Sequence, residues 1–549
     1  MKSLIKKFIT KPVRDPIASH ILWLDDLEGM DDLTALHTAT QHLAKLRDDI
    51  LISDEEIRLA ILTRVDEHNN EHILKVLSQY TKFENLRPEL ESRISETTYY
   101  YYRQLFLNYR KHIDLETKKP EINKPQLLLL LIRTMRAAFA MVKLRYYRHQ
   151  PAPDAVWLQI FSLYKTAEEK GLLNQPIKPY EGTRTTTLSA TLVQALLLDS
   201  VDQSNMRRQE IDLVAQILKK LMADVKITDV YNEKEFLFYM DLAVDKGGRR
   251  VRNFTPTPTC RYWNMDNVSL AFEVLIQSKN LKLTLEKFAL EQLASYPELP
   301  ELIQQLHSEW AKNGYRRQRR KEERNTTLRT ATITFGIETI CTQIKYLSAR
   351  NAIKNARVSD AKSFEERLSS HTVAKSNPTM SLPPYMTGGQ WTITDESPKG
   401  YGALVNKEFA KPLKPDMLIG LVIENEKDTV VIGTIKSVKV LPTGQSHIGV
   451  EVLSKQPSLI QMTPTEKKDE PVQRTDAAGA LNIVAGFQGL YLGIEAGISE
   501  SVSIVLPRLK FQYHAVYQIS SAESKSILKL GAPIEAKEDW ARVELDSQI

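Results

Sequence analysis

The stretch TVVIGTIKSVKVLPTGQSHIGVEV, residues 429–452, decides the fold of the C-terminal part of the chain. Apolar and polar side chains alternate over residues 437–440 and again over residues 448–452. This alternation is the pattern of a half-buried strand. The intervening residues 442–444, Pro-Thr-Gly, are typical of a turn. The stretch therefore predicts two antiparallel strands joined by a turn.

Further strand signals precede this hairpin. Residues 391–394 form a short extended segment, residues 417–423 are apolar, and residues 330–340 are rich in Thr and Ile, which favour strands. The intervening residues 341–390 are polar and irregular. We therefore predict a small antiparallel β-barrel over residues 311–460, with an insertion at about 341–390.

The last part of the chain predicts a second β-rich unit. Residues 461–476 are charged and are expected to form a linker. Residues 477–549 contain strand-like segments at 501–506 and 511–519. This unit could be a degenerate second barrel of the same kind.

The first 310 residues predict helices. Apolar residues recur at spacings of three and four, as at Ile57, Ile61 and Val65. Prolines separate the periodic segments, at Pro120, Pro125, Pro151, Pro153, Pro176 and Pro179. No repeat of fixed period is visible, so we expect a bundle or a loosely stacked helical array over residues 1–310, which could divide into two subdomains near 230–265. The predicted fold class is α+β and multidomain, with a large N-terminal all-α region followed by two β units.

Composition restricts the class of protein. Hydrophobic residues make up 42% of the 549 residues and charged residues 26%, which is typical of a globular chain. The 74 Lys and Arg against 68 Asp and Glu give a net charge of +6, which is weak for this length and does not demand a nucleic-acid partner. The two cysteines, Cys260 and Cys341, exclude a disulfide scaffold and fit a reducing compartment.

The sequence predicts neither an export signal nor a membrane span. The most apolar run, residues 127–142, is interrupted by Arg133 and Arg136 and is shorter than the roughly 20 residues that a span needs. A buried helix explains it better. We therefore expect a cytoplasmic protein.

A basic run, RRQRRKEER, occupies residues 316–324, where the helical pattern gives way to strands. It contains the motif RRxxxR at Arg319, Arg320 and Arg324. Because Arg316 and Arg320 also satisfy RxxxR, the register stays open. Arginine is planar and permanently charged, and it binds phosphate or guanine through two parallel hydrogen bonds.

A second motif, DESPKG, covers residues 395–400. It reads DxSxxG at Asp395, Ser397 and Gly400, and it follows the short extended segment at 391–394. Either motif alone is commonplace, because basic runs are usually solvated and such a hexapeptide is usually a turn. Their order, with a series of strands behind them, is much more specific.

This arrangement resembles the PilZ domain, the bacterial receptor module for cyclic di-GMP, over about residues 315–456. The closing strand IGVEV at 448–452 is similar to that family too. The resemblance implies a ligand-binding barrel without cofactor, metal or catalysis. It also implies ligand-binding residues: Arg319, Arg320, Arg324, Asp395, Ser397 and Gly400, with Arg316 as a further candidate.

The residue types agree with this ligand, which carries two phosphates and two guanines. Arginines can bridge phosphate oxygens, bind guanine O6 and N7, or stack on a purine. Asp395 can accept hydrogen bonds from guanine nitrogens, and Ser397 offers a small hydroxyl to the ligand or to the turn. Gly400 permits a positive φ and a close backbone approach.

One feature departs from the family. Arg324 and Asp395 lie 71 positions apart, about twice the usual separation or more. The surplus is the insertion at about 341–390, which could carry helices for oligomerisation or cover the site.

No catalytic motif stands out. Residues 68–72 match the zinc pattern HxxEH, but no third ligand is evident. Neither a phosphate-binding loop with its Lys nor a GxSxG nucleophile elbow occurs. We therefore expect neither an enzyme nor a metal site.

The sequence thus predicts a cyclic di-GMP effector whose helical region docks an unidentified protein partner. The resemblance implies outputs such as motility, pili, biofilm or polysaccharide secretion. The alternatives are a helical scaffold or chaperone-like adaptor with non-binding β domains and, less favoured, an RNA-binding protein that uses the arginine run.

Overall fold

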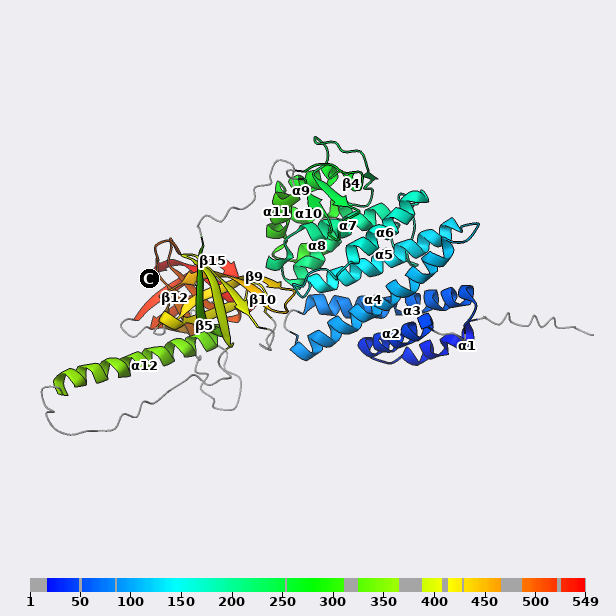
Figure 1. Ribbon diagram of the computed structural model, residues 1–549. Coiled ribbons are helices and arrows are strands. Elements are labelled where there is room, and N and C mark those ends of the chain that lie inside the picture. The colour runs from blue at the N-terminus through cyan, green and yellow to red at the C-terminus, as the bar shows by residue number, and fades with distance from the viewer. Residues whose placement is uncertain are drawn as a thin grey trace, which may run out of the picture. The chain divides into compact units, whose positions relative to one another are not determined.

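The computed structural model describes residues 17–48, 52–83, 86–251, 254–310, 324–364, 388–406, 413–426, 429–465, 486–520 and 525–548. The chain divides into two compact units, Met1–Gln318 and Arg319–Ile549. The first unit is mainly helical and the second holds two closed antiparallel β-barrels (Figure 1). The predicted α+β multidomain class is therefore confirmed.

The first unit begins with a series of helices separated by short loops. They are α1 (Ala18–Ile21), α2 (Asp32–Asp48), α3 (Glu55–Lys82), α4 (Pro88–Glu116), α5 (Lys124–Tyr146), α6 (Val156–Glu169), α7 (Leu188–Ser200) and α8 (Arg208–Leu221). Local sequence explains several starts. Asp54 accepts hydrogen bonds from the backbone nitrogens of Glu56 and Ile57, and Thr187 accepts one from Ala190. These side chains satisfy backbone donors that have no partner inside the helix.

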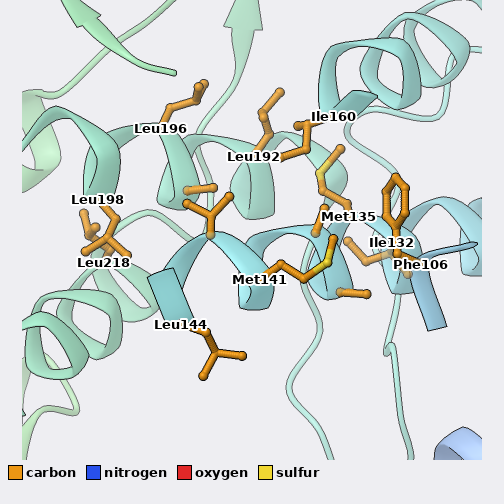
Figure 2. Close-up of a cluster of buried hydrophobic side chains, with 14 of the residues drawn as sticks. Phe106, Ile132, Met135, Met141, Leu144, Ile160, Leu192, Leu196, Leu198 and Leu218 are labelled. Atoms are coloured by element: carbon orange, nitrogen blue, oxygen red, sulfur yellow. The ribbon is translucent and has the colours of Figure 1, made fainter. Parts of the chain in front are cut away.

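The core of this unit lies around α5 and α7. The apolar run at 127–142 is in α5, a buried helix as expected, and every residue of α7 from Leu188 to Leu198 is buried. Figure 2 shows side chains of α5 packed with Ile160 of α6 and Leu192 of α7. Surrounded by apolar neighbours, α7 has no polar face, which is the pattern of a fully buried helix.

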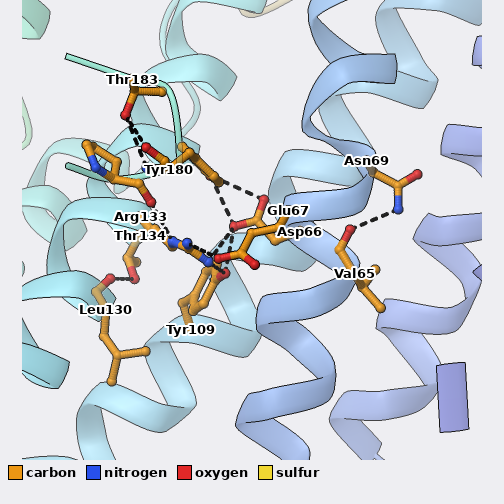
Figure 3. Close-up of polar contacts among 11 residues, drawn as sticks. Val65, Asp66, Glu67, Asn69, Tyr109, Leu130, Arg133, Thr134, Tyr180 and Thr183 are labelled. Atoms are coloured by element: carbon orange, nitrogen blue, oxygen red, sulfur yellow. Dashed lines mark hydrogen bonds and ion pairs between the residues drawn. The ribbon is translucent and has the colours of Figure 1, made fainter. Parts of the chain in front are cut away.

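A buried polar network joins α3, α4 and α5 (Figure 3). The guanidinium of Arg133, whose side chain is 3% exposed, donates to Glu67 Oε1 at 2.7 Å and to the Tyr109 hydroxyl at 3.1 Å. Tyr109 and Tyr180 in turn donate to Asp66. Burial raises the pKa of Asp66, although the charge of Arg133 opposes this. The arginine inside the apolar run is therefore accommodated by partners from other elements.

A small sheet and three helices complete the first unit. The strands are β1 (Ile227–Thr228), β2 (Phe238–Asp241), β3 (Arg249–Arg250) and β4 (Cys260–Trp263), in the order β1-β4-β2-β3, followed by α9 (Asp266–Ile276), α10 (Leu281–Lys287) and α11 (Leu299–Trp310). Asp245, after β2, accepts hydrogen bonds from the backbone nitrogens of Ala155 and Trp157 at the start of α6. Buried side chains from α2 to α11 form one continuous core, so the loops near 230–265 do not separate two cores.

The first barrel of the second unit contains six strands. They are β5 (Asn325–Phe335), β6 (Gln390–Ser397), β7 (Gly400–Val405), β8 (Leu418–Ile423), β9 (Val431–Val440) and β10 (Ser446–Ser454), closed in the order β10-β7-β6-β5-β8-β9. The stretch 429–452 supplies β9 and β10, which pair antiparallel. Ile393, Ile435, Ile448 and Val450 are among the side chains that fill the interior.

The insertion is not irregular throughout, contrary to expectation. A helix, α12 (Ile337–Phe364), replaces the end of the strand predicted at 330–340 and the first part of the polar segment. Gly336, with φ +77°, ends β5 and turns the chain into the helix. Ile337, Ile340, Cys341 and Leu347 are buried along one side of it. Their spacing of three and four was obscured by the polar residues between them; residues 365–387 lie outside the described residues.

The second barrel repeats the connectivity of the first. Its strands are β11 (Ser458–Pro464), β12 (Phe487–Leu492), β13 (Ser503–Pro507), β14 (Val516–Ser520), β15 (Lys525–Ala536) and β16 (Trp540–Gln548), closed in the order β11-β12-β13-β16-β15-β14. In both barrels the first strand pairs with the second and fourth, and the sixth pairs with the third and fifth. Residues 461–464 thus belong to this barrel and not to a linker.

The two barrels share an apolar interface around the first turns of α12. Its buried side chains pack in one cluster with Leu418 and Ile432 of the first barrel and with Leu490 and Trp540 of the second. The Trp540 indole donates to the backbone oxygen of Asp416 at 2.9 Å. The two barrels and the first turns of α12 therefore pack together as one body. The rest of α12 extends away from this body (Figure 1).

Candidate ligand site on the first barrel

A tight hairpin carries the second motif. Ser397 at the end of β6 pairs with Gly400 at the start of β7, so Pro398 and Lys399 form a two-residue turn. The Ser397 hydroxyl donates to the Gly400 carbonyl at 3.4 Å. The Lys399 carbonyl accepts from the backbone nitrogen of Val452 at 2.9 Å, which ties the turn to β10. In this structure Ser397 therefore serves the turn.

Arg324 and Asp395 meet in space although 71 positions separate them in the chain. Arg324 immediately precedes β5, and Thr326 of β5 is the register partner of Asp395 on β6. A guanidinium nitrogen of Arg324 donates to Asp395 Oδ1 and forms an ion pair with it. The two side chains are 20% and 25% exposed, so the pair lies at the surface, where a ligand can reach it.

The other motif arginines cannot be placed. Arg316, Arg319 and Arg320 lie within residues 311–323, outside the described residues. Their contribution to the site stays a prediction. Of the six residues expected to bind ligand, the structure brings together Arg324, Asp395, Ser397 and Gly400.

Glycines form the surface beside the ion pair. A Cβ at Gly400 would lie 2.5 Å from the Val450 carbonyl oxygen, and one at Gly402 would collide with the Asp395 carboxylate. Gly400 is not among the residues with positive φ, so close packing and not backbone conformation requires glycine there. Of the two properties expected of Gly400, the structure shows the close backbone approach and not the positive φ.

One row of side-chain positions crosses the outer face of five strands. Thr326, Asp395, Gly402, Gly449 and Ser437 are successive register partners on β5, β6, β7, β10 and β9. The chain neighbours of Gly402 and Gly449 pack in the barrel interior, so these two glycines face outward. The Asp395 carboxylate lies over Gly402 and the Ser437 hydroxyl over Gly449, so both polar groups share this outer face. The result is a strip with two glycines in the middle and polar groups at either side.

The sequence analysis missed Gly402 and Gly449 as parts of this surface, and it missed the exposed Leu328 further along β5. Gly402 could have been found from its spacing of two from Gly400, because alternate residues of a strand share a face. Leu328 lies on β5 at an irregularity in its pairing with β6 and is 82% exposed. Bulges often re-aim side chains beside functional sites. No sequence signal distinguished this leucine from a core residue.

A second ion-pair cluster lies where β5 and β6 approach the end of β8. Arg329 pairs with Glu396 and, at 3.2 Å, with Glu426. Burial, together with the charges of Glu426 and Glu396, raises the pKa of Tyr401 to about 12, and the charge of Arg329 opposes this rise. The second carboxylate of the DESPKG motif is therefore engaged by Arg329, which leaves Asp395 as the motif carboxylate beside Arg324.

The corresponding face of the second barrel is covered. Leu490 and Leu492 of β12 and Val505 of β13 stand on the strands equivalent to β6 and β7, and all three are buried in the cluster around α12. Apolar side chains thus occupy the face that carries Asp395 and Gly402 in the first barrel. In the second barrel this face serves packing.

Within the part of the chain that the structure describes, no three His, Cys, Asp or Glu side chains are grouped as a metal would require. None of the helices described there combines the length and apolar character needed to span a membrane.

Comparison with known proteins gives one match. Residues 20–233 match the family model of the N-terminal domain of the cyclic-di-GMP receptor FimW. No curated protein and no solved structure matches the chain. The match lies wholly within the helical unit, where the sequence analysis identified no family, and it does not include the barrels. It therefore supports a receptor of this class by a route independent of the barrel motifs, without reporting on a PilZ domain.

Proposed function

We propose that the chain is a cyclic di-GMP receptor and effector whose ligand site is the outer face of the first barrel. The observation that carries the proposal is the meeting of Arg324 and Asp395 beside the glycines of β7. The family match over residues 20–233 supports it, because that family model is named for a cyclic-di-GMP receptor.

The geometry favours a planar, anionic ligand. Asp395 accepts hydrogen bonds from guanine nitrogens, and Arg324 reaches a phosphate or the O6 and N7 edge of the same base. Because Gly402 and Gly449 have no side chains, the Asp395 carboxylate and the Ser437 hydroxyl lie directly over the backbone of β7 and β10, where both can meet the edge of a base. Because Arg324 already pairs with Asp395, ligand binding exchanges one set of charge-assisted hydrogen bonds for another.

Arg316, Arg319 and Arg320 complete the site in this proposal. They belong to the segment that links the helical unit to the first strand of the barrel. Ligand phosphates draw these arginines onto the barrel, and the linking segment then changes the relation between the two units. Such a switch needs only that the ligand bind one arrangement better than the other.

The proposed role is binding and signalling and not catalysis. The helical unit is the output part and docks a protein partner, in pathways such as motility, pili, biofilm or polysaccharide secretion. The protein acts in the cytoplasm, where the second messenger is made.

Calorimetric titration of the full chain with cyclic di-GMP tests this function. We expect a Kd in the micromolar range or tighter, weakened at least about tenfold by Arg324→Ala, because a charge-assisted pair is lost. Arg508→Ala, in the second barrel, is the matched control and should leave the Kd unchanged. GTP and cyclic di-AMP should bind much more weakly.

Two results would overturn the proposal. One is a folded wild-type protein that does not bind cyclic di-GMP, which would favour a helical adaptor with structural barrels. The other is binding that Arg324→Ala and Arg508→Ala leave equally intact.

A further inference from the structure

Basic side chains from three elements gather on one surface of the helical unit. Arg136 lies on α5, Arg184 in the loop between α6 and α7, and Lys219 and Lys220 at the end of α8. Arg184 and Lys219 are exposed, and the others are half-buried. Among the described residues, none of these four side chains has a carboxylate within ion-pair distance.

The relative positions of α5 and α8 place basic side chains of the two helices opposite each other. Lys143 Nζ of α5 lies 3.0 Å from Asp212 Oδ1 of α8, which joins the two helices. Arg136 stands seven residues before Lys143, and Lys219 stands seven residues after Asp212. Seven residues are about two turns, or roughly 10 Å, along each helix. Beyond the Lys143–Asp212 pair, Arg136 therefore comes to face Lys219.

The electrostatics agree with this placement. Partial loss of water contact, together with the positive charges of Arg136, Lys143, Lys220 and Arg184, lowers the pKa of Lys219. Partial loss of water contact and then Arg184 lower the pKa of Lys220, against the opposing charge of Glu291. Each cation therefore makes its neighbours less stable in the charged form.

Arg136 is also held in place. Its guanidinium carbon lies 5.4 Å from the centroid of the Tyr180 ring. The Tyr180 hydroxyl is fixed by a 3.0 Å hydrogen bond to Asp66 in the buried network. The basic surface thus rests on a rigid part of the core.

Several other cations of this unit, in contrast, are paired with carboxylates. Lys75 lies 2.8 Å from Glu71, Arg110 lies 3.3 Å from Asp114, and Lys119 lies 2.7 Å from Glu116. A concentration of unpaired like charges destabilises the unit, and groups held at such a cost often serve a functional site.

We propose that Arg136, Lys143, Arg184, Lys219 and Lys220, which we term the basic patch, form a docking surface for an acidic segment of a partner protein. Charge complementarity favours an anionic partner. The patch is compact and the net charge of the chain is only +6, whereas nucleic-acid binding draws on an extended basic surface. This inference does not depend on ligand binding at the barrel.

Fluorescence anisotropy with the full chain tests the docking surface. The probe is a labelled 12-residue peptide of alternating Glu and Ser, titrated at low salt. The variant Arg136→Gln/Lys219→Gln/Lys220→Gln should raise the Kd about tenfold or more. The matched control Lys246→Gln/Lys279→Gln/Lys282→Gln removes three charges from exposed positions of the same unit and should change the Kd less than about twofold.

Thermal unfolding gives a second readout. Because the patch cations repel one another, the patch variant should unfold about 1–2 °C higher than wild type, whereas the control should not. The proposal is overturned if the peptide does not bind, or if both variants weaken binding equally. It is also overturned if a 12-base-pair DNA duplex binds more tightly than the peptide and depends equally on the patch.

Discussion

At the residue scale, the ion pair between Arg324 and Asp395 shows how a site can be built from residues that also stabilise the unliganded protein. A partly exposed pair of this kind contributes only about 0–1 kcal/mol to stability. Ligand groups can therefore replace it at little cost. The glycines beside this pair have a different role. Because Gly402 has no side chain, the Asp395 carboxylate can lie against the backbone of β7.

Leu328 offers the cleanest test of this surface at the residue scale. Because its side chain is 82% exposed, Leu328→Ala removes few contacts and should leave the free energy of unfolding within about 0.5 kcal/mol of wild type. If a bound base covers this part of β5, the same change should raise the Kd for cyclic di-GMP about three- to tenfold, because apolar contact is lost. Calorimetric titration measures the shift.

The matched control is Leu509→Ala in the second barrel, where the leucine is 96% exposed. It should alter neither stability nor affinity. Equal affinities for the two variants would show that the ligand does not reach Leu328.

At the element scale, α12 determines how the second unit is assembled. Its first turns present apolar side chains to both barrels, and the same face of the second barrel that would otherwise be free for ligand is covered there. The first turns of α12 therefore pack against both barrels, and the stability of one barrel depends on the other.

Ile340→Ala should therefore destabilise both barrels together. Ile340 is fully buried between them, and its truncation should cost about 2–5 kcal/mol through lost apolar contact and a cavity. Urea unfolding, monitored by near-UV circular dichroism, should show that both barrels unfold in one transition, whose midpoint lies at a lower urea concentration than in the wild type. Thr342→Ala, two residues further along the helix and exposed, should leave the midpoint unchanged. A shift confined to one barrel would contradict this role of α12.

A second prediction at this scale concerns α7. Asp199 at its end accepts a hydrogen bond from the Tyr146 hydroxyl, and burial raises the pKa of Asp199 to about 6. Because the folded state favours the protonated carboxyl, its stabilising contribution is complete below the ordinary pKa of 3.8 and is lost as the pH rises through about 6.

Asp199→Asn imitates the protonated form at every pH. Relative to this variant, the wild type should become less stable between about pH 4 and pH 7, as measured by urea unfolding at each pH. Parallel pH profiles for the two proteins would show that Asp199 keeps an ordinary pKa.

At the scale of the whole molecule, the helical unit and the barrel unit have separate cores. Differential scanning calorimetry should therefore resolve two transitions. Cyclic di-GMP at about 100 times its Kd adds about 2.7 kcal/mol to the unit that binds it, a rise of roughly 5–10 °C. The rise should affect the barrel transition alone, and at the same ligand concentration it should be about half as large or smaller in Arg324→Ala. A rise in the helical transition would place the ligand in the other unit.

The two barrels share one strand order but use it differently. In the first barrel, the strands β6 and β7 present Asp395 and glycines outward; in the second, the equivalent strands present leucines that pack against α12. This division explains why the ligand motifs occur once in the chain although the topology occurs twice.

Local patterns in the sequence were sufficient for much of the fold. The alternation at 429–452 predicted β9 and β10, the apolar run at 127–142 predicted a buried helix, and the two motifs indicated Arg324 and Asp395. Each inference depends on residues close together in the chain, where the period of a strand or helix is directly visible. The helical family match was not predicted, because it depends on a pattern spread over more than two hundred residues.

Tertiary structure alone decided the rest. The sequence could not show that Arg324 and Asp395 meet across an insertion of this length, because their contact depends on the closure of the barrel. Nor could it place Arg136 opposite Lys219, which depends on the relative register of α5 and α8. Both arrangements are set by long-range packing, and the separation of two residues in a sequence carries no information about it.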